Sequence, residues 1–320
     1  MNIARFLQRA AGLYPDHPAL ALDDRVTSTY ADFARDAGRL GQGLADRYGL
    51  QSGDRVAICM SNRPDYAIIV FACWWAGVAI VAINAKLHRR EISFILQDSG
   101  AKLCFGCPKT ASLLTGLDSE SESLQQVIIA DHGGLAPLFA DAQALLSERQ
   151  NDELAWLFYT SGTTGRPKGA MISHGNLLSM PQAYLTDVDS ISPGAALLHM
   201  APMSHGSGLY ALPFVASGGI QVMPGNGGFD EAVFFRLLAD WPESSMFAAP
   251  TMVSRLTTHA RTNKPDHRNR RTVIYGGGPL YLDNLKAAAS VFGPKFAQIY
   301  GQGECPMTIT SMSRQNFTMA

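Results

Sequence analysis

Residues 154–169 read LAWLFYTSGTTGRPKG, an apolar run followed by a segment rich in hydroxyl side chains and glycine. The apolar part, Leu154 to Phe158, predicts a strand. We expect the composition of the part from Tyr159 to Gly169 to exclude a helix or a regular strand. Glycine lets backbone N–H groups approach a ligand, and hydroxyls with a lysine ammonium add donors and positive charge. The stretch therefore predicts a strand that ends in an anion-binding loop, with triphosphate as the expected guest.

The spacing within this loop differs from that of the Walker loop. The pattern Gly-x-x-x-x-Gly-Lys-Ser/Thr cannot be laid over Gly162 to Gly169, and glycine instead of a hydroxyl residue follows Lys168. A surface turn that binds nothing is the alternative, because most runs rich in Ser, Thr and Gly are turns. The ordered ending Arg-Pro-Lys-Gly favours a phosphate loop of another kind.

Length and composition indicate a globular protein of about two domains or lobes. The chain has 320 residues, of which 47% are hydrophobic and 17% are charged, and its net charge is −1. No basic block or stripe accompanies this charge, which argues against nucleic acid as a partner. Five cysteines scattered through a chain of this length do not make a disulfide framework.

Two segments bear on the location of the protein. Residues 3–10 are amphipathic and lack the apolar core and cleavage site of a signal peptide. Tyr66 to Ile83 is uncharged and reaches the lower length limit of a membrane span. Gly77 divides this stretch into a helical half and a β-rich half, so we expect a buried helix followed by a buried strand. These patterns predict a cytoplasmic protein without a transmembrane span, and they leave its oligomeric state open.

Strands and helices alternate from Gly53 onward, which predicts parallel strands joined by crossover helices and an α/β fold. A first series leads to the loop and includes an expected helix at Ala140 to Glu148. A second series runs from Leu197 to Tyr300, and the turn-rich stretch Asp187 to Gly194 is the expected boundary between the two.

We therefore predict two packed lobes of mostly parallel sheet flanked by helices. Lobe one covers about residues 51–190 and lobe two about residues 191–320, and residues 1–50 join them. Three further loops follow strands of the second series, namely Pro202 to Gly208, Gly276 to Leu280 and Tyr300 to Glu304. Ligands in open α/β sheets bind outside the carboxyl ends of strands, so we expect one site made by these loops and residues 159–169.

These loops carry candidate roles of their own. Glu304 suits Mg²⁺, which prefers one or two protein carboxylates and otherwise phosphate and water, although an ordinary exposed carboxylate is the alternative. Gly276 to Gly278 leave a shelf free of side chains for an adenine ring, with Tyr300 available to stack on it. Such a glycine turn taken alone is most often just a turn. His205 has no second His or Cys at metal spacing, so a positioning or gating role is preferred.

Together and in this order, the segments resemble the adenylate-forming superfamily, whose members include acyl-CoA synthetases, luciferases and the adenylation domains of peptide synthetases. Residues 154–169 resemble its phosphate-loop signature, and Tyr300 to Glu304 resembles its Tyr-Gly-x-Thr-Glu motif. Gly276 to Leu280 is similar to its Gly-Gly-Ala-Pro-Leu segment, and Pro202 to Gly208 to its aromatic-His-x-x-Gly segment. Pro250-Thr251-Met252 matches the opening of a helix that lines the acyl pocket.

The resemblance implies the large N-terminal domain of an acyl-CoA synthetase-like fold and an ATP-dependent carboxylic acid:CoA ligase. ATP and Mg²⁺ are the implied cofactors, CoA is the implied co-substrate, and a small carboxylic acid is activated as an acyl-adenylate. Amino-acid-activating relatives place an aspartate in the segment that corresponds to Met203 to Gly208. This chain has no acidic residue there, so a fatty or aromatic acid is implied.

The resemblance also assigns residues to roles. The implied catalytic residues are Lys168, Glu304 and His205, and the implied ligands of Mg²⁺ are Glu304 and Thr160. The implied phosphate contacts are Thr160, Ser161, Gly162, Thr163, Thr164, Gly165 and Lys168. The implied adenine contacts are Gly276, Gly277, Gly278, Pro279 and Tyr300, with Gly301 and Gln302 beside them facing the acyl group.

Two departures from the family pattern limit what can be carried over. Gly303 stands where the family usually has threonine, which removes a hydroxyl expected near the α-phosphate. The chain stops at Ala320, before the family's ribose-binding aspartate, hinge and C-terminal domain with its adenylation lysine. We therefore expect the N-terminal core of a longer enzyme, with weak ATP binding and little adenylation activity as a fragment.

The sequence leaves two other functions to consider. A catalytically silent nucleotide-binding or regulatory module of the same fold is favoured by Gly303 and by the absent C-terminal part. A serine hydrolase requires Gly-x-Ser-x-Gly at a strand–helix elbow, and the sequence contains no such motif.

Overall fold

The computed structural model describes residues 1–130, 135–161 and 166–316. The chain divides into two compact units: unit 1 is Met1–Pro15 with Tyr30–Leu178, and unit 2 is Asp16–Thr29 with Ser179–Ala320. The division falls inside the helix α6 (His174–Asp187), earlier than the turn-rich stretch expected from the sequence. Residues 1–15 and 30–50 belong to unit 1, and residues 16–29 belong to unit 2.

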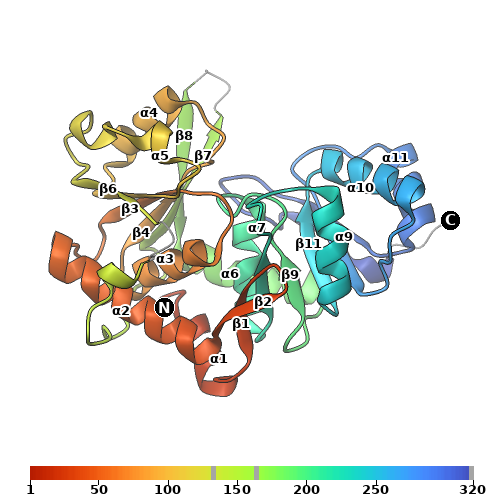
Figure 1. Cartoon of the computed structure of the whole chain (residues 1–320), viewed down its shortest axis with the longest axis horizontal. Helices are drawn as coiled ribbons and strands as arrows, with labels where there is room; N and C mark the ends of the chain where they lie inside the picture. The colour runs from red at the N-terminus through yellow and green to blue at the C-terminus, as the bar shows by residue number, and fades with distance from the viewer. Residues whose placement is uncertain (131–134, 162–165, 317–320) are drawn as a thin grey trace. The chain divides into compact units, whose positions relative to one another are not determined.

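Unit 1 is built on a sheet whose described part has six strands in the order β6-β5-β3-β4-β7-β8 (Figure 1). These are β3 (Arg55–Cys59), β4 (Ala79–Ala82), β5 (Leu103–Gly106), β6 (Gln126–Ile129), β7 (Leu154–Ser161) and β8 (Pro167–Ser173). Every neighbouring pair is parallel except β7 and β8, which are antiparallel. The mostly parallel α/β sheet expected for the first lobe is confirmed.

Helices cover both faces of this sheet, with α4 and α5 on the opposite side from α2 and α3 (Figure 1). The helices are α1 (Arg5–Leu13), α2 (Tyr30–Tyr48), α3 (Pro64–Trp75), α4 (Arg89–Ser99) and α5 (Ala111–Leu114), with short 3₁₀ turns at Leu117–Ser119 and Ala136–Leu138. Trp74 of α3 packs against Trp156 of β7, with ring centroids 6.1 Å apart. On the other face, Ile92 and Leu96 of α4 join the core cluster that contains Ala57. Successive residues of a strand point to opposite faces of the sheet. Because helices cover both faces, residues on both sides of a central strand are buried, and such strands are apolar almost without interruption.

The long uncharged stretch forms a helix and a strand, as the sequence predicted. All residues from Tyr66 to Trp75 are buried in α3, and the four residues of β4 are buried as well. Gly77 separates the two elements with a φ of 77°, a conformation that glycine adopts without steric cost. None of the helices in the described part of the chain has the length and apolar character needed to cross a bilayer.

The helix predicted at Ala140 to Glu148 is wrong, because this segment is extended and irregular. Backbone groups of this segment form hydrogen bonds with other elements and not with one another. The N–H of Ala140 donates to the carbonyl of Arg39, at 3.1 Å, and the N–H of Ser147 donates to the carbonyl of Trp75, at 2.9 Å. The side-chain amide of Asn2 donates to the carbonyl of Ser147, at 2.8 Å. These partners satisfy backbone groups that a helix would have paired internally.

Unit 2 is built on a sheet whose described strands follow the order β14-β13-β12-β11-β9-β10-β1-β2. They are β1 (Pro18–Leu22), β2 (Arg25–Thr29), β9 (Ala196–Leu198), β10 (Ile220–Met223), β11 (Ser244–Ala248), β12 (Arg270–Tyr275), β13 (Phe296–Tyr300) and β14 (Thr310–Met312). The central pairs are parallel, and the two edge pairs, β1–β2 and β13–β14, are antiparallel. The sequence did not predict β2 or β14.

Helices also cover both faces of the unit 2 sheet. One face carries α9 (Glu231–Asp240), α10 (Pro250–Asn263) and α11 (Leu282–Phe292), which lie together in Figure 1. Their residues Phe234, Leu256 and Phe292 share one core cluster with the strands. The other face carries α7 (Gly206–Leu209) and α8 (Ala211–Ala216), and the ring of Tyr210 between them lies 5.7 Å from that of Phe247 in β11.

Candidate functional site

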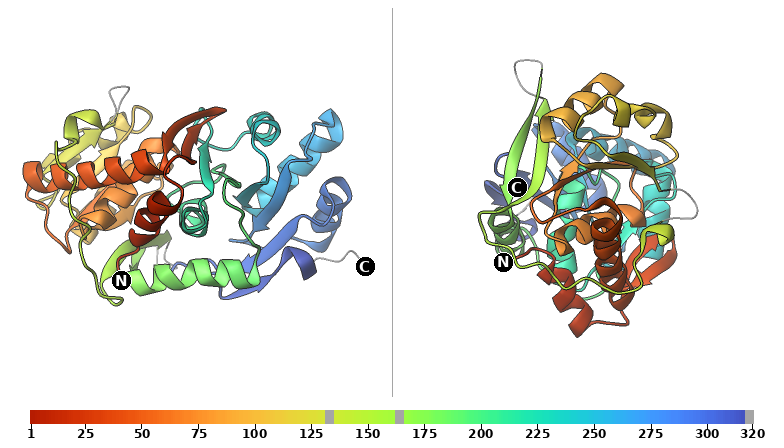
Figure 2. Two further views of the ribbon diagram at one scale, coloured as in Figure 1. Left: turned by 90° about the horizontal axis from the view of Figure 1, so that it is seen from below. Right: turned by 90° about the vertical axis from the view of Figure 1, so that its left-hand side faces the viewer.

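The predicted phosphate loop is a β-hairpin whose two strands lie side by side in Figure 1 and in the right-hand view of Figure 2. The strand β7 continues through Ser161, and β8 begins at Pro167. The expectation that this composition excludes a regular strand is therefore wrong for both flanks of the loop. The strand β8 lies at one edge of the described sheet and begins at Pro167. Proline has no backbone N–H to donate, and the first position of an edge strand is one of the few strand positions where this is acceptable.

The hairpin register places the two main phosphate candidates opposite each other. Thr160 of β7 pairs with Lys168 of β8, and directly opposed residues of an antiparallel pair share one face of the sheet. Lys168 is exposed and Thr160 is partly exposed, so both are open to a ligand. The backbone of Ser161 ends β7 opposite Pro167. The other predicted contacts, Gly162, Thr163, Thr164 and Gly165, lie outside the described residues.

Tyr159 fixes the base of this hairpin. Its hydroxyl donates a 2.6 Å hydrogen bond to the carboxylate of Asp98, near the end of α4. Its ring covers Gly169, where a Cβ atom would lie 2.9 Å from the ring. Glycine at this position is therefore required by packing. Burial, together with Asp98, raises the pKa of the Tyr159 phenol, which stays protonated as the donor of this bond.

The predicted adenine shelf follows β12. Gly276 is buried against the neighbouring strand. A Cβ atom there would lie 2.8 Å from the carbonyl oxygen of Ile299, so this position has no room for a side chain. Gly277 and Gly278 are exposed, and the nearest atoms to a Cβ on Gly278 belong to Pro250, 3.7 Å away. The backbone of Gly277 and Gly278 is therefore exposed at the carboxyl end of β12, with no side chains of its own to cover it. Pro250 has its place at the first turn of α10, where its missing N–H costs nothing.

The predicted metal-binding loop follows β13 and turns back through β14. The N–H of Ile309 donates to the carbonyl of Tyr300, at 2.8 Å, and the side-chain amide of Gln302 donates to the hydroxyl of Tyr300, at 2.8 Å. A Cβ atom on Gly301 would lie 2.6 to 2.8 Å from the backbone of Met307, so the two sides of the loop are in close contact. Glu304 is exposed at its tip.

His205 lies in the loop that connects β9 to α7, as predicted. The ring Nδ1 lies 2.9 Å from the hydroxyl oxygen of Ser204, and partial burial lowers the pKa of the imidazole. The loop is tightly folded, since a Cβ atom on Gly208 would lie 1.8 Å from the carbonyl oxygen of Met203. The lowered pKa favours a neutral ring at pH 7, which suits an uncharged wall for a ligand.

Sequence reasoning missed the buried polar group behind this loop. His199 lies directly after β9 and contacts Ser207 and Gln221, and all three side chains are buried. The only sign of this group in the sequence is a single histidine, His199, within the apolar run Ala195 to Ala201. A lone buried polar residue needs a partner, and partners distant in sequence cannot be identified from the pattern alone.

The described residues assigned to phosphate belong to unit 1, and those assigned to adenine belong to unit 2. The two assigned Mg²⁺ ligands, Thr160 and Glu304, are divided between the units. Thr160 and Lys168 belong to unit 1, whereas His205, Gly276 and Glu304 belong to unit 2. In the residues that the structure describes, no three His, Cys, Asp or Glu side chains are grouped so as to hold a metal ion. One exposed carboxylate fits Mg²⁺ that arrives with a nucleotide, because phosphate and water then complete its coordination.

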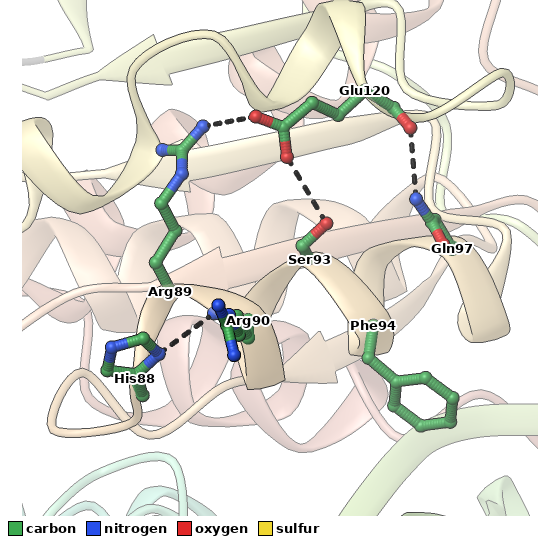
Figure 3. Close-up of a pocket in the computed structure, with 7 residues that line it drawn as sticks. All are labelled: His88, Arg89, Arg90, Ser93, Phe94, Gln97 and Glu120. Carbon is green, nitrogen blue, oxygen red and sulfur yellow. Dashed lines mark hydrogen bonds and ion pairs between the residues drawn. The ribbon is translucent and has the colours of Figure 1, made fainter.

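Unit 1 also contains a pocket of about 410 Å³ at the side of α4 (Figure 3). Its lining residues are His88, Arg89, Arg90, Ser93, Phe94, Gln97 and Glu120. The guanidinium of Arg89 pairs with the carboxylate of Glu120 at 2.6 Å, and the side-chain amide of Gln97 donates to the backbone carbonyl of Glu120 at 3.0 Å. Arg89 and Glu120 thus bind each other and join α4 to the segment at Glu120.

Comparison with known proteins identifies related sequences along nearly the whole chain. The sequence profile of a family described as AMP-binding enzyme matches residues 7–319. A feruloyl-CoA synthase of an Amycolatopsis species is 32% identical over 288 residues, which are 89% of this chain and 56% of that protein. The 2-succinylbenzoate–CoA ligase of Bacillus subtilis strain 168 is 30% identical over 314 residues, 96% of this chain and 60% of that protein. The chain spans about half the length of the curated relatives it matches.

Solved structures show the same fold. The N-terminal domain of FACL13 from Mycobacterium tuberculosis superposes with a TM-score of 0.83 at 23% identity, over 94% of this chain and 76% of that one. ATP-bound MatB from Rhodopseudomonas palustris superposes with a TM-score of 0.82 at 27% identity, over 97% of this chain and 62% of that one. The expected acyl-CoA synthetase-like N-terminal fold is confirmed.

Proposed function

The chain belongs to the AMP-binding enzyme family, and on that premise we propose that the complete protein is an ATP-dependent carboxylic acid:CoA ligase. In the first step a carboxylate oxygen of the acid attacks the α-phosphate of ATP, and pyrophosphate leaves with the electrons of the broken P–O bond. In the second step the sulfur of CoA attacks the acyl carbonyl, the thiol proton is lost, and AMP leaves.

The observation that carries this proposal is the register that pairs Thr160 with Lys168 on one face of the hairpin. An exposed ammonium opposite a hydroxyl binds phosphate oxygens, and fixed donors stabilise the charge that develops when pyrophosphate leaves. We assign Thr160, Ser161 and Lys168 to the β- and γ-phosphates, together with Gly162, Thr163, Thr164 and Gly165.

The loops of unit 2 receive the rest of the nucleotide in this proposal. The exposed residues Gly277, Gly278 and Pro279, with the buried Gly276 before them, take the adenine ring. Tyr300 is 52% exposed, and in this proposal its ring stacks on the adenine. Glu304, with Thr160, holds Mg²⁺, which when bound would neutralise phosphate charge.

The acid in this proposal is fatty or aromatic. His205, Gly301 and Gln302 face it, and partial burial keeps the His205 ring neutral as a wall of that pocket. The loop from Met203 to Gly208 offers no carboxylate to pair with a substrate amine. The names of the related feruloyl-CoA synthase and of a medium/long-chain fatty-acid–CoA ligase of Mycobacterium tuberculosis, 26% identical, support the two acid classes.

The test is ATP–pyrophosphate exchange by the complete protein against a panel of fatty, aromatic and amino acids, followed by thioester formation with CoA. We expect exchange with at least one fatty or aromatic acid and none with amino acids. We also expect the 320-residue chain alone to bind ATP weakly and to exchange little pyrophosphate. Robust exchange by this chain would contradict that expectation.

A catalytically silent nucleotide-binding module is the second candidate, favoured by Gly303 beside Glu304. Glycine there provides no hydroxyl for the α-phosphate, while the carboxylate for Mg²⁺ is retained. Binding of ATP by the complete protein without exchange on any acid of the panel would establish this alternative in place of the ligase. Substituting Gly303→Thr and recovering exchange would assign the silence to the missing hydroxyl.

A further inference from the structure

The buried ring of His199 has a defined partner at each nitrogen. Its Nδ1 lies 2.8 Å from the hydroxyl oxygen of Ser207, and its Nε2 lies 3.0 Å from the amide oxygen of Gln221. Burial lowers the pKa of His199 to about 4. The ring is therefore neutral at pH 7 and carries a single N–H.

The position of this hydrogen follows from the orientation of Gln221. The side-chain NH₂ of Gln221 donates to the carbonyl of Gly219, at 3.4 Å, so its amide oxygen faces His199. An amide oxygen only accepts hydrogen bonds, and Nε2 of His199 must therefore carry the hydrogen. The Nδ1 is then a bare acceptor, and the hydroxyl of Ser207 donates to it.

This hydrogen bond anchors the loop that carries His205. Ser207 lies two residues after His205, in the first turn of α7. The loop has little room to shift, because a Cβ atom on Gly206 would lie 2.6 Å from the ring of Phe247. Since the Ser207 hydroxyl has one hydrogen and gives it to His199, the position of the loop is tied to the tautomer of this ring.

We propose that His199 is a positioning residue, which in its Nε2–H tautomer accepts the Ser207 hydroxyl and holds the His205 loop in place for the carboxylic acid. This inference rests on the proposed function for the role of His205 toward the acid. His199 itself is fully buried and does not touch the substrate. The ring stays neutral near pH 7, so this hydrogen bond does not depend on pH there.

The first test is ¹⁵N NMR of the 320-residue chain labelled at histidine, with resonances assigned from His199→Gln and His205→Gln. We expect a neutral His199 with its proton on Nε2 and no titration between about pH 5.5 and about pH 8. Ser207→Ala is expected to shift the Nδ1 resonance of His199 and the ring resonances of His205. A proton on Nδ1, or unchanged His205 resonances in Ser207→Ala, would overturn the proposal.

The second test is steady-state kinetics of the complete protein. Losing one hydrogen bond of about 1 kcal/mol corresponds to about a fivefold change, so Ser207→Ala is expected to raise the KM for the acid about fivefold. The KM for ATP is expected to stay within about twofold. An equal effect on both substrates would indicate general loosening and would overturn the positioning role.

Ser245→Ala is the matched control. Ser245 is buried in the neighbouring strand β11, and in the described part of the chain its hydroxyl has no hydrogen-bond partner. Its removal is expected to leave the KM for the acid and the His199 and His205 resonances unchanged. If no acid on the panel supports exchange, the proposed function fails, and the NMR experiment alone then decides whether His199 holds the His205 loop.

Discussion

The hydroxyl of Tyr159 donates a 2.6 Å hydrogen bond to the carboxylate of Asp98, which ties the base of the hairpin to α4. Tyr159 is 8% exposed and Asp98 is exposed, so the bond stands at the border of solvent. We expect Tyr159→Phe to lower the free energy of unfolding of the 320-residue chain by about 1 kcal/mol, because one hydrogen bond is lost and the ring is kept. Urea denaturation measures this change.

Asp98→Asn is the control for Tyr159→Phe. Asparagine keeps an acceptor oxygen for the Tyr159 hydroxyl, so we expect a smaller loss of stability than in Tyr159→Phe. A larger loss in Asp98→Asn would mean that the carboxylate serves another partner, and the assigned role of this bond would be wrong.

Lys168 stands exposed opposite Thr160, and the proposed function assigns its ammonium to the phosphates of ATP. We expect Lys168→Ala to lower the rate of pyrophosphate exchange by the complete protein about a hundredfold, because a cation at the leaving phosphates is lost. The free energy of unfolding should stay within about 0.5 kcal/mol of the original. Pyrophosphate exchange and urea denaturation check the two parts of this prediction.

Two further substitutions isolate the charge at Lys168. Lys168→Arg keeps the charge on a side chain of another shape, and we expect an intermediate exchange rate. Lys286→Ala removes an exposed lysine of α11 that has no assigned role toward the ligand, and should leave the rate unchanged. Equal rates in Lys168→Ala and Lys286→Ala would exclude Lys168 from the reaction.

Secondary structure was predicted correctly where the local sequence pattern and the packing of the folded chain favour the same element. The apolar run from Leu154 to Phe158 predicted its strand directly, and this run lies within β7. The pattern did not predict that β8 would begin at Pro167 and place Lys168 opposite Thr160, because strand pairing depends on a partner and not on local propensity. Gly169 contributed to the prediction of a loop, but it lies in β8, where the ring of Tyr159 leaves no room for a Cβ atom.

The errors have the same physical origin. The stretch from Ala140 to Glu148 has a helical pattern, but Asn2, Arg39 and Trp75 take its backbone hydrogen bonds. Such partners are far away in sequence and leave no local signal. The role of His199 was missed for this reason too, since Ser207 and Gln221 become its neighbours only in the folded sheet.

Gly301 faces the backbone of Met307, and a Cβ atom would approach its N, C and O atoms to between 2.6 and 2.8 Å. Backbone cannot move aside as a flexible side chain does. We therefore expect Gly301→Ala to lower the free energy of unfolding by about 2 kcal/mol and to weaken ATP binding through displacement of the loop. Urea denaturation and calorimetric titration with ATP measure the two effects.

Gly278→Ala is the matched control for stability. Its new Cβ atom would meet Pro250 at 3.7 Å, an ordinary contact distance, so we expect a change below about 0.5 kcal/mol. If Gly278→Ala is as destabilising as Gly301→Ala, the close approach to Met307 does not explain the glycine at position 301.

His174 begins α6 in a buried position and accepts a hydrogen bond from the backbone N–H of Ile3, at 3.1 Å, through Nδ1. Burial lowers its pKa from 6.5 to about 4, and the positive charges of Arg149 and of the chain's N-terminus act in the same direction. The unfolded chain therefore binds a proton between these two pH values that the folded chain does not bind. Stability is fully present above pH 6.5 and declines as the pH falls toward 4.

We expect His174 to account for a loss of roughly 2 kcal/mol in the free energy of unfolding between about pH 7 and about pH 4.5. His174→Gln keeps an acceptor for the N–H of Ile3 and does not titrate, so urea denaturation of this variant should show a shallower decline over that range. His17→Gln removes an exposed histidine and should decline as the original chain does. An unchanged slope in His174→Gln would show that His174 is not responsible for the acid sensitivity.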